Sequence, residues 1–579
     1  MRDTVRPIER GLVSLLFLAP LLFGTVEFWS LAVVEIVCLF LLLLFFFRML
    51  GTKQPMTPLI QPPLLVPITL LLAVAVIQII PVPPGLLKVL APGTYGVYRE
   101  TLPDEGTLPW LTLSLYPYAS FLEIVRFLAY IGIYFLTVQV VRDKESIARM
   151  TAFVLIAGTG IALLGIFQSI FWNGKLLWFR RLSQGGSPFG PYVNRNHFAG
   201  LMEMIIPVAA GMFIYLLPSV RSSQGMKTAV TDFLTHRKVN TSILTGAAAV
   251  IMITALFLTL SRGGIIGLSL SMLFFGLMLA LRNSTRKKGR TIIFLFLVIL
   301  FTVGWFGWGR VLERFEKIRH LDTSSEFRIN NWKDSLNIVA AFPLFGTGLG
   351  TYEQIYPKYK TVPTQERWEH AHNDYLEAAV ELGIPVLVIA LYGMGSFYVT
   401  MFRILRRRKS LYSRLLGIGG IAGITGIVIH SFTDFNLHVG ANGLYFSFLL
   451  GFAVAVSHMR TGEGNEGTLL KMTEITISSG KRAALKAAVM LIFIFLSAIP
   501  LFNAGAEIYY ALAKGSLREG SGLASRGIML ERARILSPLD ARLPFAEGNI
   551  DYALGRTGDA AGNYARAVAL NPADRKSVV

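Results

Sequence analysis

The sequence predicts an all-α, polytopic helical membrane protein with about 12–13 transmembrane helices, a large periplasmic loop and a C-terminal helical, tetratricopeptide-like tail. Of the 579 residues, 53% are hydrophobic and 16% are charged, and the mean hydropathy is +0.55. Soluble proteins carry about 25% charged residues, so this chain has too little polar surface for a set of soluble domains. It is also too rich in Phe, Ile and Leu to be a disordered chain.

Apolar runs long enough to cross a bilayer, which takes about 20 residues, recur along most of the chain. The expected spans, about thirteen in number, lie near residues 11–26, 29–47, 64–80, 119–141, 147–172, 198–218, 242–260, 264–281, 291–309, 378–402, 415–435, 441–458 and 484–502. The first is short and contains Pro20, as a signal peptide can, but no small-residue cleavage motif separates it from the second. We therefore expect these two spans to form a retained helical hairpin.

Basic residues predict the orientation of the spans. Segments 282–290 and 403–414 contain Lys and Arg without any acidic residue, and segments 221–238 and 481–486 and the N-terminus are also basic. Lys and Arg favour cytoplasmic loops, and with thirteen spans these segments share one side with a cytoplasmic N-terminus. Much of the net charge of +20 is therefore a topology signal, and we expect no nucleic-acid partner.

The opposite side receives segments 81–118 and 173–197, the loop at about 310–377, and the C-terminus. Residues 310–369 carry nine basic and eight acidic residues, a balance typical of an exported segment. In a bacterium this side is the periplasm and the membrane is the inner membrane. We divide the chain into a transmembrane domain, 1–502, and a periplasmic tail, 503–579.

The tail contains an internal repeat. Residues 532–542 and 566–576 align at an offset of 34, so that Leu536 matches Leu570 and Pro538 matches Pro572. A 34-residue period with a closing Pro is typical of tetratricopeptide repeats. Two repeats are fewer than a free solenoid needs, so we expect the tail to pack on the membrane domain, to bind a partner or to be cut short. A short helical pair without a binding role is the alternative.

Polar residues near span ends are costly and therefore indicate functional sites. The segment 190–200 precedes a span and contains Asn194, Arg195, Asn196 and His197. The planar guanidinium of Arg195 suits phosphate oxygens, although an interfacial Arg with a helix-capping Asn explains the segment equally simply.

A second such motif is the turn Ser-Arg-Gly-Gly at 261–264. A tight turn needs only the glycines, so Arg262 is either an anion site or an anchor for lipid headgroups.

The outer loop carries a third group. Arg328 and Trp332 are four residues apart on a predicted helix, where they can stack on each other. The Gly-x-Gly-x-Gly run at 346–350 lacks the spacing and the preceding strand of a nucleotide site, and we interpret it as a flexible turn.

The fourth motif, at 369–385, places His370 and His372 just before an apolar helix that Asn373 or Asp374 can cap. A histidine at the mouth of a membrane cavity can accept a proton near neutral pH. Zinc is disfavoured, because no further ligand is evident and the single cysteine, Cys38, lies in an apolar run.

A weaker cluster follows at 430–438. We expect His430, Asp434 and His438 on one helix face, in an internal hydrogen-bond network rather than around a metal.

In their order along the chain, these motifs resemble the O-antigen ligase and polymerase superfamily of bacterial envelope membrane proteins. The similar segments are N-R-N-H-F-A-G, S-R-G-G, R-x-x-x-W, P-x-x-G-x-G-x-G-x-Y and H-N-x-Y-L-E. His372, Asn373 and Gly383 match the family's His-Asn, nine residues, Gly motif, whereas Val386 replaces its usual small or polar residue. The resemblance covers roughly residues 10–460, and the repeat tail matches a subgroup.

The resemblance implies a glycosyltransferase that works at the periplasmic face. The donor would be a glycan on undecaprenyl diphosphate, and the acceptor another lipid-linked glycan, lipid A–core or a protein hydroxyl. Neither a nucleotide sugar nor an essential metal or other cofactor is implied. A polymerase or a role in exopolysaccharide assembly is favoured, with a ligase close behind.

The same resemblance assigns roles to residues. His372 would be the general base. Arg195 and Arg262, with Arg328 as a helper, would neutralise the leaving diphosphate. Further substrate contacts are expected from His370, Asn196, His197 and Asn373.

Two other classes of protein stay open. A transporter or flippase of lipid-linked glycans usually has related halves and polar residues at the membrane midplane, and this chain shows no repeat among its spans. A non-catalytic scaffold that displays the tail would not need Arg195, Arg262 or His372.

Overall fold

The computed structural model covers the whole chain. It describes every residue except 1, 52–57, 103–107, 183–185, 218–237, 295–296, 298–322, 363–367, 460–469, 476, 516–521 and 574–579. The predicted span at 291–309 and the basic segment at 221–238 therefore lie largely outside the described residues.

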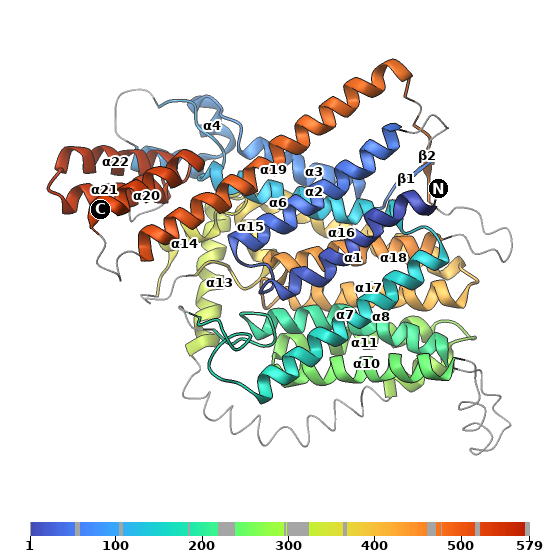
Figure 1. Ribbon diagram of the computed structural model, residues 1–579. Helices are drawn as coiled ribbons and strands as arrows, with labels where there is room; N and C mark the ends of the chain where they lie inside the picture. Colours follow the sequence, from blue (N-terminus) through green and yellow to red (C-terminus); the bar gives the residue numbers. More distant parts are fainter. Residues whose placement is uncertain are drawn as a thin grey trace, which may run out of the picture.

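The fold is all-α, as predicted, and its helices form an elongated bundle (Figure 1). The helices are α1 (Arg2–Leu21), α2 (Phe28–Gly51), α3 (Leu65–Gln78), α4 (Pro84–Leu90), α5 (Pro92–Thr101), α6 (Pro117–Val140), α7 (Lys144–Ile170), α8 (Arg195–Leu216), α10 (Val239–Leu258), α11 (Arg262–Ala280), α13 (Thr323–Ala341), α14 (Tyr352–Tyr359), α15 (Asp374–Leu382), α16 (Ile384–Arg407), α17 (Leu411–His430), η1 (Asn436–His438), α18 (Gly440–His458), α19 (Ser479–Gly515), α20 (Leu523–Leu536), α21 (Arg542–Ala553) and α22 (Thr557–Leu570). Two short strands, β1 (Leu59–Ile60) and β2 (Met472–Thr473), pair antiparallel.

Ten of the described helices are long and apolar enough to cross a membrane, which confirms a polytopic protein. They are α2, α6, α7, α8, α10, α11, α16, α17, α18 and α19. The first predicted span corresponds to α1, which ends at Leu21 and turns into α2, and the third corresponds to the shorter apolar helix α3.

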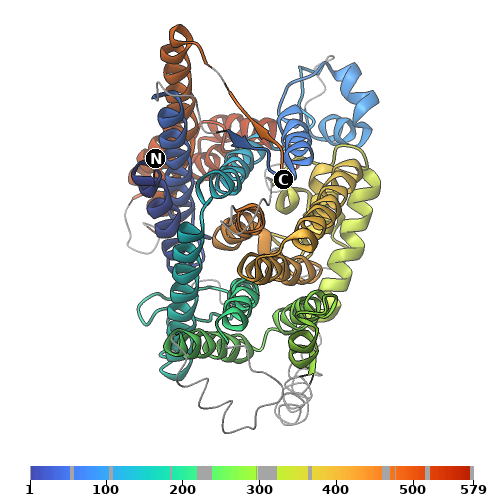
Figure 2. The same cartoon turned by 90° about the vertical axis from the view of Figure 1, so that its right-hand side faces the viewer.

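Helices α8, α17 and α18 form the inside of the bundle. Figure 2 shows the orange helices of residues 411–458 enclosed by the others. Glycines let α17 approach α8 closely, since a Cβ at Gly423 would lie 2.3 Å from the Met204 carbonyl oxygen. Small residues at such contacts are typical of helix packing in membranes. This tight centre fixes the ends of α8 and α17 relative to each other.

A small outer subdomain sits at one end of the bundle. Helices α4, α5, α13 and α14 enclose a second apolar core, whose buried members include Leu87, Leu115, Ile338 and Ile355. The carbonyl oxygen of Ala371 accepts a hydrogen bond from Trp332 Nε1 at 2.9 Å, which ties α13 to the segment before α15.

The tail packs on this same end of the molecule (Figure 1). Helices α20 and α22 begin and end 34 residues apart, at 523–536 and 557–570, as the sequence repeat predicts. Asp540 accepts a hydrogen bond from Tyr116 at 3.2 Å, and the Tyr118 hydroxyl lies 2.6 Å from Ser537 Oγ. The expected boundary at residue 503 falls inside α19, which continues to Gly515.

Candidate functional site

The connection between α17 and α18, here called the 430–438 turn, is the point where distant parts of the chain meet. The expectation that His430, Asp434 and His438 share one helix face is wrong, because α17 ends at His430 and η1 begins only at Asn436. The break in the helix points the three side chains into three different polar networks.

The carboxylate of Asp434 is the centre of the first network. It accepts hydrogen bonds from Asn196 Nδ2 at 2.6 Å and from the Phe435 backbone N–H at 2.9 Å. His197 Nε2 lies 3.6 Å and His372 Nδ1 3.4 Å from its Oδ1 atom. Burial by itself would raise the pKa of Asp434, but the neighbouring His197 and His372 hold that pKa well below its usual range. Asp434 is therefore a buried, ionised carboxylate.

His372 stands in an unusual backbone conformation. Its φ is +50°, in the left-handed region, and the next residue, Asn373, is the N-cap of α15 and accepts hydrogen bonds from Tyr375 N and Leu376 N. The imidazole packs edge-on against the rings of Trp368 and Phe435. Strained residues of this kind concentrate at functional sites. Here the strain aims the His372 ring at Asp434.

The three arginines predicted to bind the diphosphate lie in segments that contact the 430–438 turn. Arg195 and Arg262 are the first residues of α8 and α11, which begin at the N-caps Asn194 and Ser261. Gly263 packs against His430 so closely that a Cβ there would lie 2.5 Å from the ring. Arg328 Nη1 donates to the Thr433 carbonyl oxygen at 3.4 Å.

A second network surrounds Glu377, on the first turn of α15. His370 Nδ1 lies 2.6 Å from Glu377 Oε1, and His438 Nε2 lies 3.4 Å from the same oxygen. His438 Nδ1 lies 2.9 Å from Asp374 Oδ1. Burial alone would raise the pKa of Glu377, yet His438 and His370 lower it to about 2. Burial opposes the charge of His438, but Glu377 and Asp374 raise its pKa to about 10. In this cluster, the carboxylate of Glu377 and the imidazole of His438 therefore form a pair of opposite charges.

The Phe435 ring separates the two networks. It stacks on His370, with 4.2 Å between ring centroids, and also touches His372 and His197. The two histidines of the His-x-His motif thus have different carboxylate partners, and they do not form a common metal site.

A third pair lies inside the bundle. His430 Nδ1 lies 3.0 Å from Glu203 Oε1 on α8, and both side chains are almost fully buried. A Cβ at Gly267 would lie 2.3 Å from Glu203 Oε2, so α11 packs directly over the pair. The pair joins α8 and α17 just beneath the start of α11.

The interpretation of the glycine run at 346–350 as a flexible turn is wrong. Gly346, Gly348 and Gly350 all have positive φ, and the loop is held by hydrogen bonds on both sides. Glu381 accepts hydrogen bonds from the backbone N–H groups of Gly350 and Tyr352, at 2.8 and 3.0 Å. The loop is a packed support for α15, the helix that follows His372.

Most of the carboxylates at this site were missed from the sequence. The sequence predicts no role for Glu377, offers Asp374 only as a helix cap and places Asp434 in a network with other histidines, although each of the three partners a histidine of this site. The available signal was the density of titratable residues in 369–381 and 430–438. Sequence spacing alone does not show that Asn196 and Asp434, 238 residues apart, are in contact.

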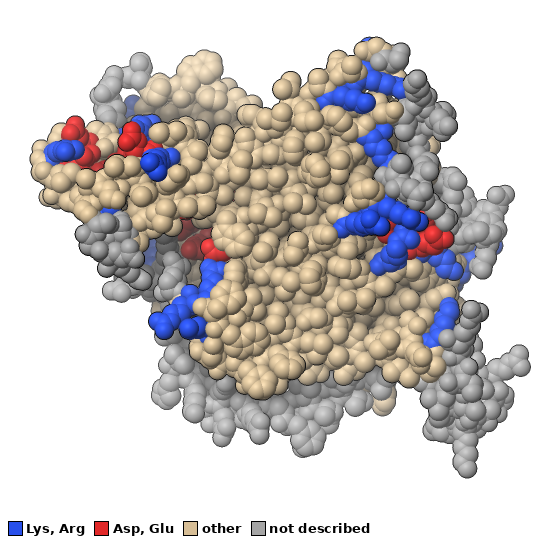
Figure 3. Space-filling view, in the orientation of Figure 1, with Lys and Arg blue, Asp and Glu red and all other residues tan. Residues whose placement is uncertain are grey.

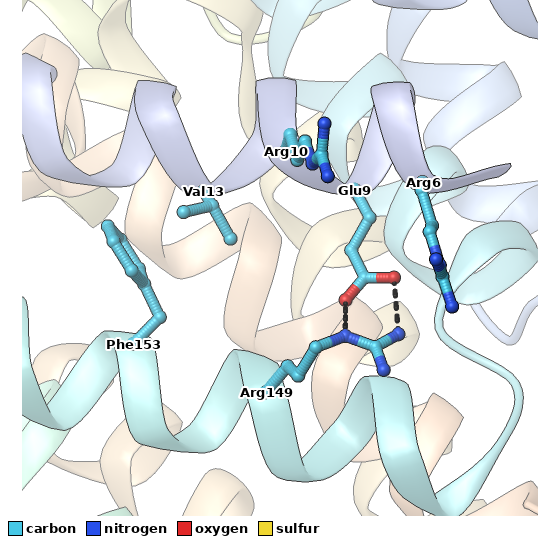
Figure 4. A pocket seen from close by; sticks show the side chains of 6 residues that line it. All are labelled: Arg6, Glu9, Arg10, Val13, Arg149 and Phe153. Carbon is cyan, nitrogen blue, oxygen red and sulfur yellow. Dashed lines mark hydrogen bonds and ion pairs between the residues drawn. The ribbon is translucent and has the colours of Figure 1, made fainter. Parts of the chain in front are cut away.

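A pocket of about 400 Å³ lies elsewhere, between α1 and α7. Figure 4 shows Glu9 and Arg149 paired across it, with Arg6 and Arg10 beside them. Because α7 leads through residues 171–194 to the start of α8, the first turns of α7 and α8 lie at opposite ends of the bundle. None of the predicted site residues lines this pocket.

Comparison with known families finds a match in the middle of the chain. Residues 247–391 match the family described as O-antigen ligase. The match includes Arg262, Arg328, His370, His372 and Asn373. No curated protein matches the chain. The match covers 145 of the 579 residues, so this part of a multi-pass membrane protein is similar to O-antigen ligases.

Proposed function

We propose that the protein transfers or polymerises a glycan carried on undecaprenyl diphosphate, at the periplasmic face of a bacterial inner membrane. The acceptor is a hydroxyl of another lipid-linked glycan, of lipid A–core or of a protein. The observation that carries this proposal is the meeting of His372, Asn196 and His197 at the buried carboxylate of Asp434.

His372 is the general base of the proposed reaction. Its Nδ1 lies on the side of Asp434, at 3.4 Å from Oδ1, and its second ring nitrogen is the atom that accepts the proton of the attacking hydroxyl. The ionised Asp434 then stabilises the imidazolium that forms. Asp434 acts through His372 and is a positioning residue.

Arg195 and Arg262 bind the diphosphate, and Arg328 assists them. As the bond between sugar and phosphate breaks, negative charge grows on the lipid diphosphate, and fixed cations stabilise it. Both arginines stand at helix N-termini, where the helix dipole adds positive potential. Asn196, His197 and Asn373 complete the wall of the site, whereas His370 lies on the other side of Phe435. A single displacement would invert the anomeric centre.

The proposed orientation is supported by the distribution of charge. Lys and Arg gather at the end that carries the N-terminus and the start of α19 (Figure 3), including Lys481, Arg482 and Lys486. By the positive-inside rule this end is cytoplasmic, and the 430–438 turn, the outer subdomain and the tail are periplasmic. The tail helices α20–α22 form a tetratricopeptide-like unit that can receive a periplasmic protein partner.

The test is a deletion strain of the host complemented with wild type, His372→Ala or Lys333→Ala, at matched membrane levels. Lys333 is an exposed cation on α13 and serves as the control. We expect Lys333→Ala to restore surface glycan and His372→Ala to fail.

The glycan species that accumulates in the His372→Ala strain identifies the step that is lost. Single repeat units on lipid A indicate a polymerase, and polymer left on the lipid carrier indicates a ligase. Full restoration by His372→Ala would contradict the assignment of the base and favour a transporter or scaffold.

A further inference from the structure

The histidine–carboxylate cluster on the far side of Phe435 has the composition of a metal site. His370, Glu377 and His438 each offer a ligand atom, and these atoms lie within 4.8 Å of one another. None of the three contacts Asp434 among the described hydrogen bonds and ion pairs, so the cluster is separate from the proposed general base.

The three ligand atoms converge on one point. Both His370 Nδ1 and His438 Nε2 face the same oxygen, Glu377 Oε1, at 2.6 and 3.4 Å. Ligands held at about 2.0–2.2 Å around a tetrahedral ion lie roughly 3.3–3.5 Å apart. The pair of His370 and Glu377 would have to open by less than about 1 Å to admit an ion, and the pair of His438 and Glu377 already has this spacing.

The surrounding contacts hold the three ligands in place. Asp374 faces His438 Nδ1 at 2.9 Å and so turns Nε2 toward Glu377, where an incoming ion would displace the Nε2 proton. The Ala371 N–H donates to Glu377 Oε2 at 2.8 Å and leaves Oε1 for the cluster. Phe435 stacks on His370. A carboxylate behind a ligating histidine is typical of protein metal sites.

The cluster is closed on one side and open on the other. The Glu377 side chain is 1% exposed, whereas those of His370 and His438 are 27% and 23% exposed. Two histidines, one glutamate and an open position for water form a donor set that suits Zn²⁺.

We propose that His370, Glu377 and His438 bind a divalent transition-metal ion, with Zn²⁺ as the preferred ion. The ion joins the segment before α15 to η1, and so holds His372, two residues from His370, against Asp434 in the 430–438 turn. Its role is positional. The transfer reaction itself does not use it, so the proposed function stands whether or not the ion binds.

The experiment measures zinc directly. The full-length chain is purified in detergent through a tag without histidine, stripped with a chelator, incubated with Zn²⁺ and gel-filtered. Zinc per chain is then counted by mass spectrometry. We expect one Zn²⁺ for wild type, and a loss of most of it in His370→Gln and in His438→Gln.

The matched control is His372→Gln, which changes the other histidine of the same motif and should keep its zinc. Loss of zinc in His372→Gln with retention in His438→Gln would overturn the proposal in favour of a His-x-His site. A wild type that retains no zinc would also overturn it.

A variant that replaces one metal-binding side chain by another distinguishes loss of the site from misfolding. His438→Cys should bind Co²⁺ and show a thiolate-to-cobalt charge-transfer absorption that wild type lacks. The native Cys38 is fully buried and cannot supply this signal. Binding of Co²⁺ by His438→Cys without that absorption would place the ion elsewhere and refute the assignment.

Discussion

At the scale of single residues, one carboxylate organises the candidate site. Asp434 accepts hydrogen bonds from α8 and from its own turn, and His372, in the segment before α15, lies 3.4 Å from it. A buried charge is tolerated only when its surroundings supply such donors. Removing the charge should therefore disturb the imidazole of His372 more than it disturbs the fold.

Asp434→Asn tests this positioning role in a transfer assay with purified protein and a lipid-diphosphate-linked glycan. We expect kcat to fall by about 10- to 100-fold, because the imidazolium loses its counter-charge while KM changes little. Asp334→Asn is the matched control. Asp334 is equally buried but binds Tyr356 and Thr361 in the outer subdomain. An equal loss of kcat in both variants would indicate a purely structural effect.

The backbone of His372 offers a second test. Its φ of +50° suits Asn but not a β-branched residue. His372→Asn should abolish transfer and leave the unfolding temperature near that of wild type. His372→Val should additionally lower stability by about 1–2 kcal/mol, measured by thermal unfolding in detergent. Equal stability of the two variants would show that the left-handed conformation is not required.

The residues of the site could be predicted only in part. His372, Arg195 and Arg262 stand in short local motifs, and the structure brings their segments to one turn. The role of Glu377 and the partners of Asp434 could not be predicted, because they depend on contacts between segments far apart in sequence. A sequence pattern also could not show that α17 ends at His430, since Phe432 and Phe435 continue the apolar character of the span.

At the scale of elements, the start of α15 depends on the glycine loop behind it. Gly383 separates α15 from α16 with a φ of +85°, and a Cβ there would lie 2.3 Å from the Leu344 carbonyl oxygen. Gly346 approaches the end of α15 just as closely. These contacts transmit the position of the loop to His372, at the other end of the same short helix.

Gly383→Ala should lower stability by more than about 1 kcal/mol, because the position is both left-handed and crowded. Gly395→Ala, inside α16 with no atom within 4 Å of the added methyl group, should be neutral or stabilise the protein by about 0.4–1 kcal/mol. Thermal unfolding of both variants in the same detergent measures the difference. A neutral Gly383→Ala would refute the tight packing of α15 on the loop.

The tail is a second element whose attachment can be tested. Tyr116 and Tyr118 at the start of α6 reach Asp540 and Ser537, and the double variant Tyr116→Phe/Tyr118→Phe keeps the rings but removes both hydroxyls. Each lost buried hydrogen bond should cost about 1–3 kcal/mol of docking. Hydrogen exchange should rise in α20–α22 and stay constant in α17 and α18.

Tyr564→Phe is the control for the tail. It removes an exposed hydrogen bond to Asn549 within the tail. If the double variant exchanges no faster than this control, the two tyrosines do not hold the tail on the membrane domain.

At the scale of the whole molecule, the architecture could be predicted because it depends on composition. A bilayer needs long apolar helices, and hydropathy reports them residue by residue without reference to distant contacts. The same reasoning could not place the boundary of the tail, since α19 continues without interruption from the membrane span to Gly515. The contacts between α19 and α20 lie in the last part of α19, and hydropathy does not separate that part from the membrane span.

The orientation of the protein in the membrane can be tested by labelling single introduced cysteines. Cys38 is the only cysteine and is fully buried, so single introduced cysteines report accessibility with little background. Thr433→Cys lies in the exposed part of the 430–438 turn, and Arg407→Cys lies at the exposed end of α16. In intact cells, a membrane-impermeant maleimide should label Thr433→Cys within minutes and should label Arg407→Cys only after the inner membrane is permeabilised. Arg407 belongs to a segment without acidic residues, which by its charge stays in the cytoplasm. The reverse labelling pattern would place the Asp434 network on the cytoplasmic side, and it would exclude a periplasmic transfer reaction at His372.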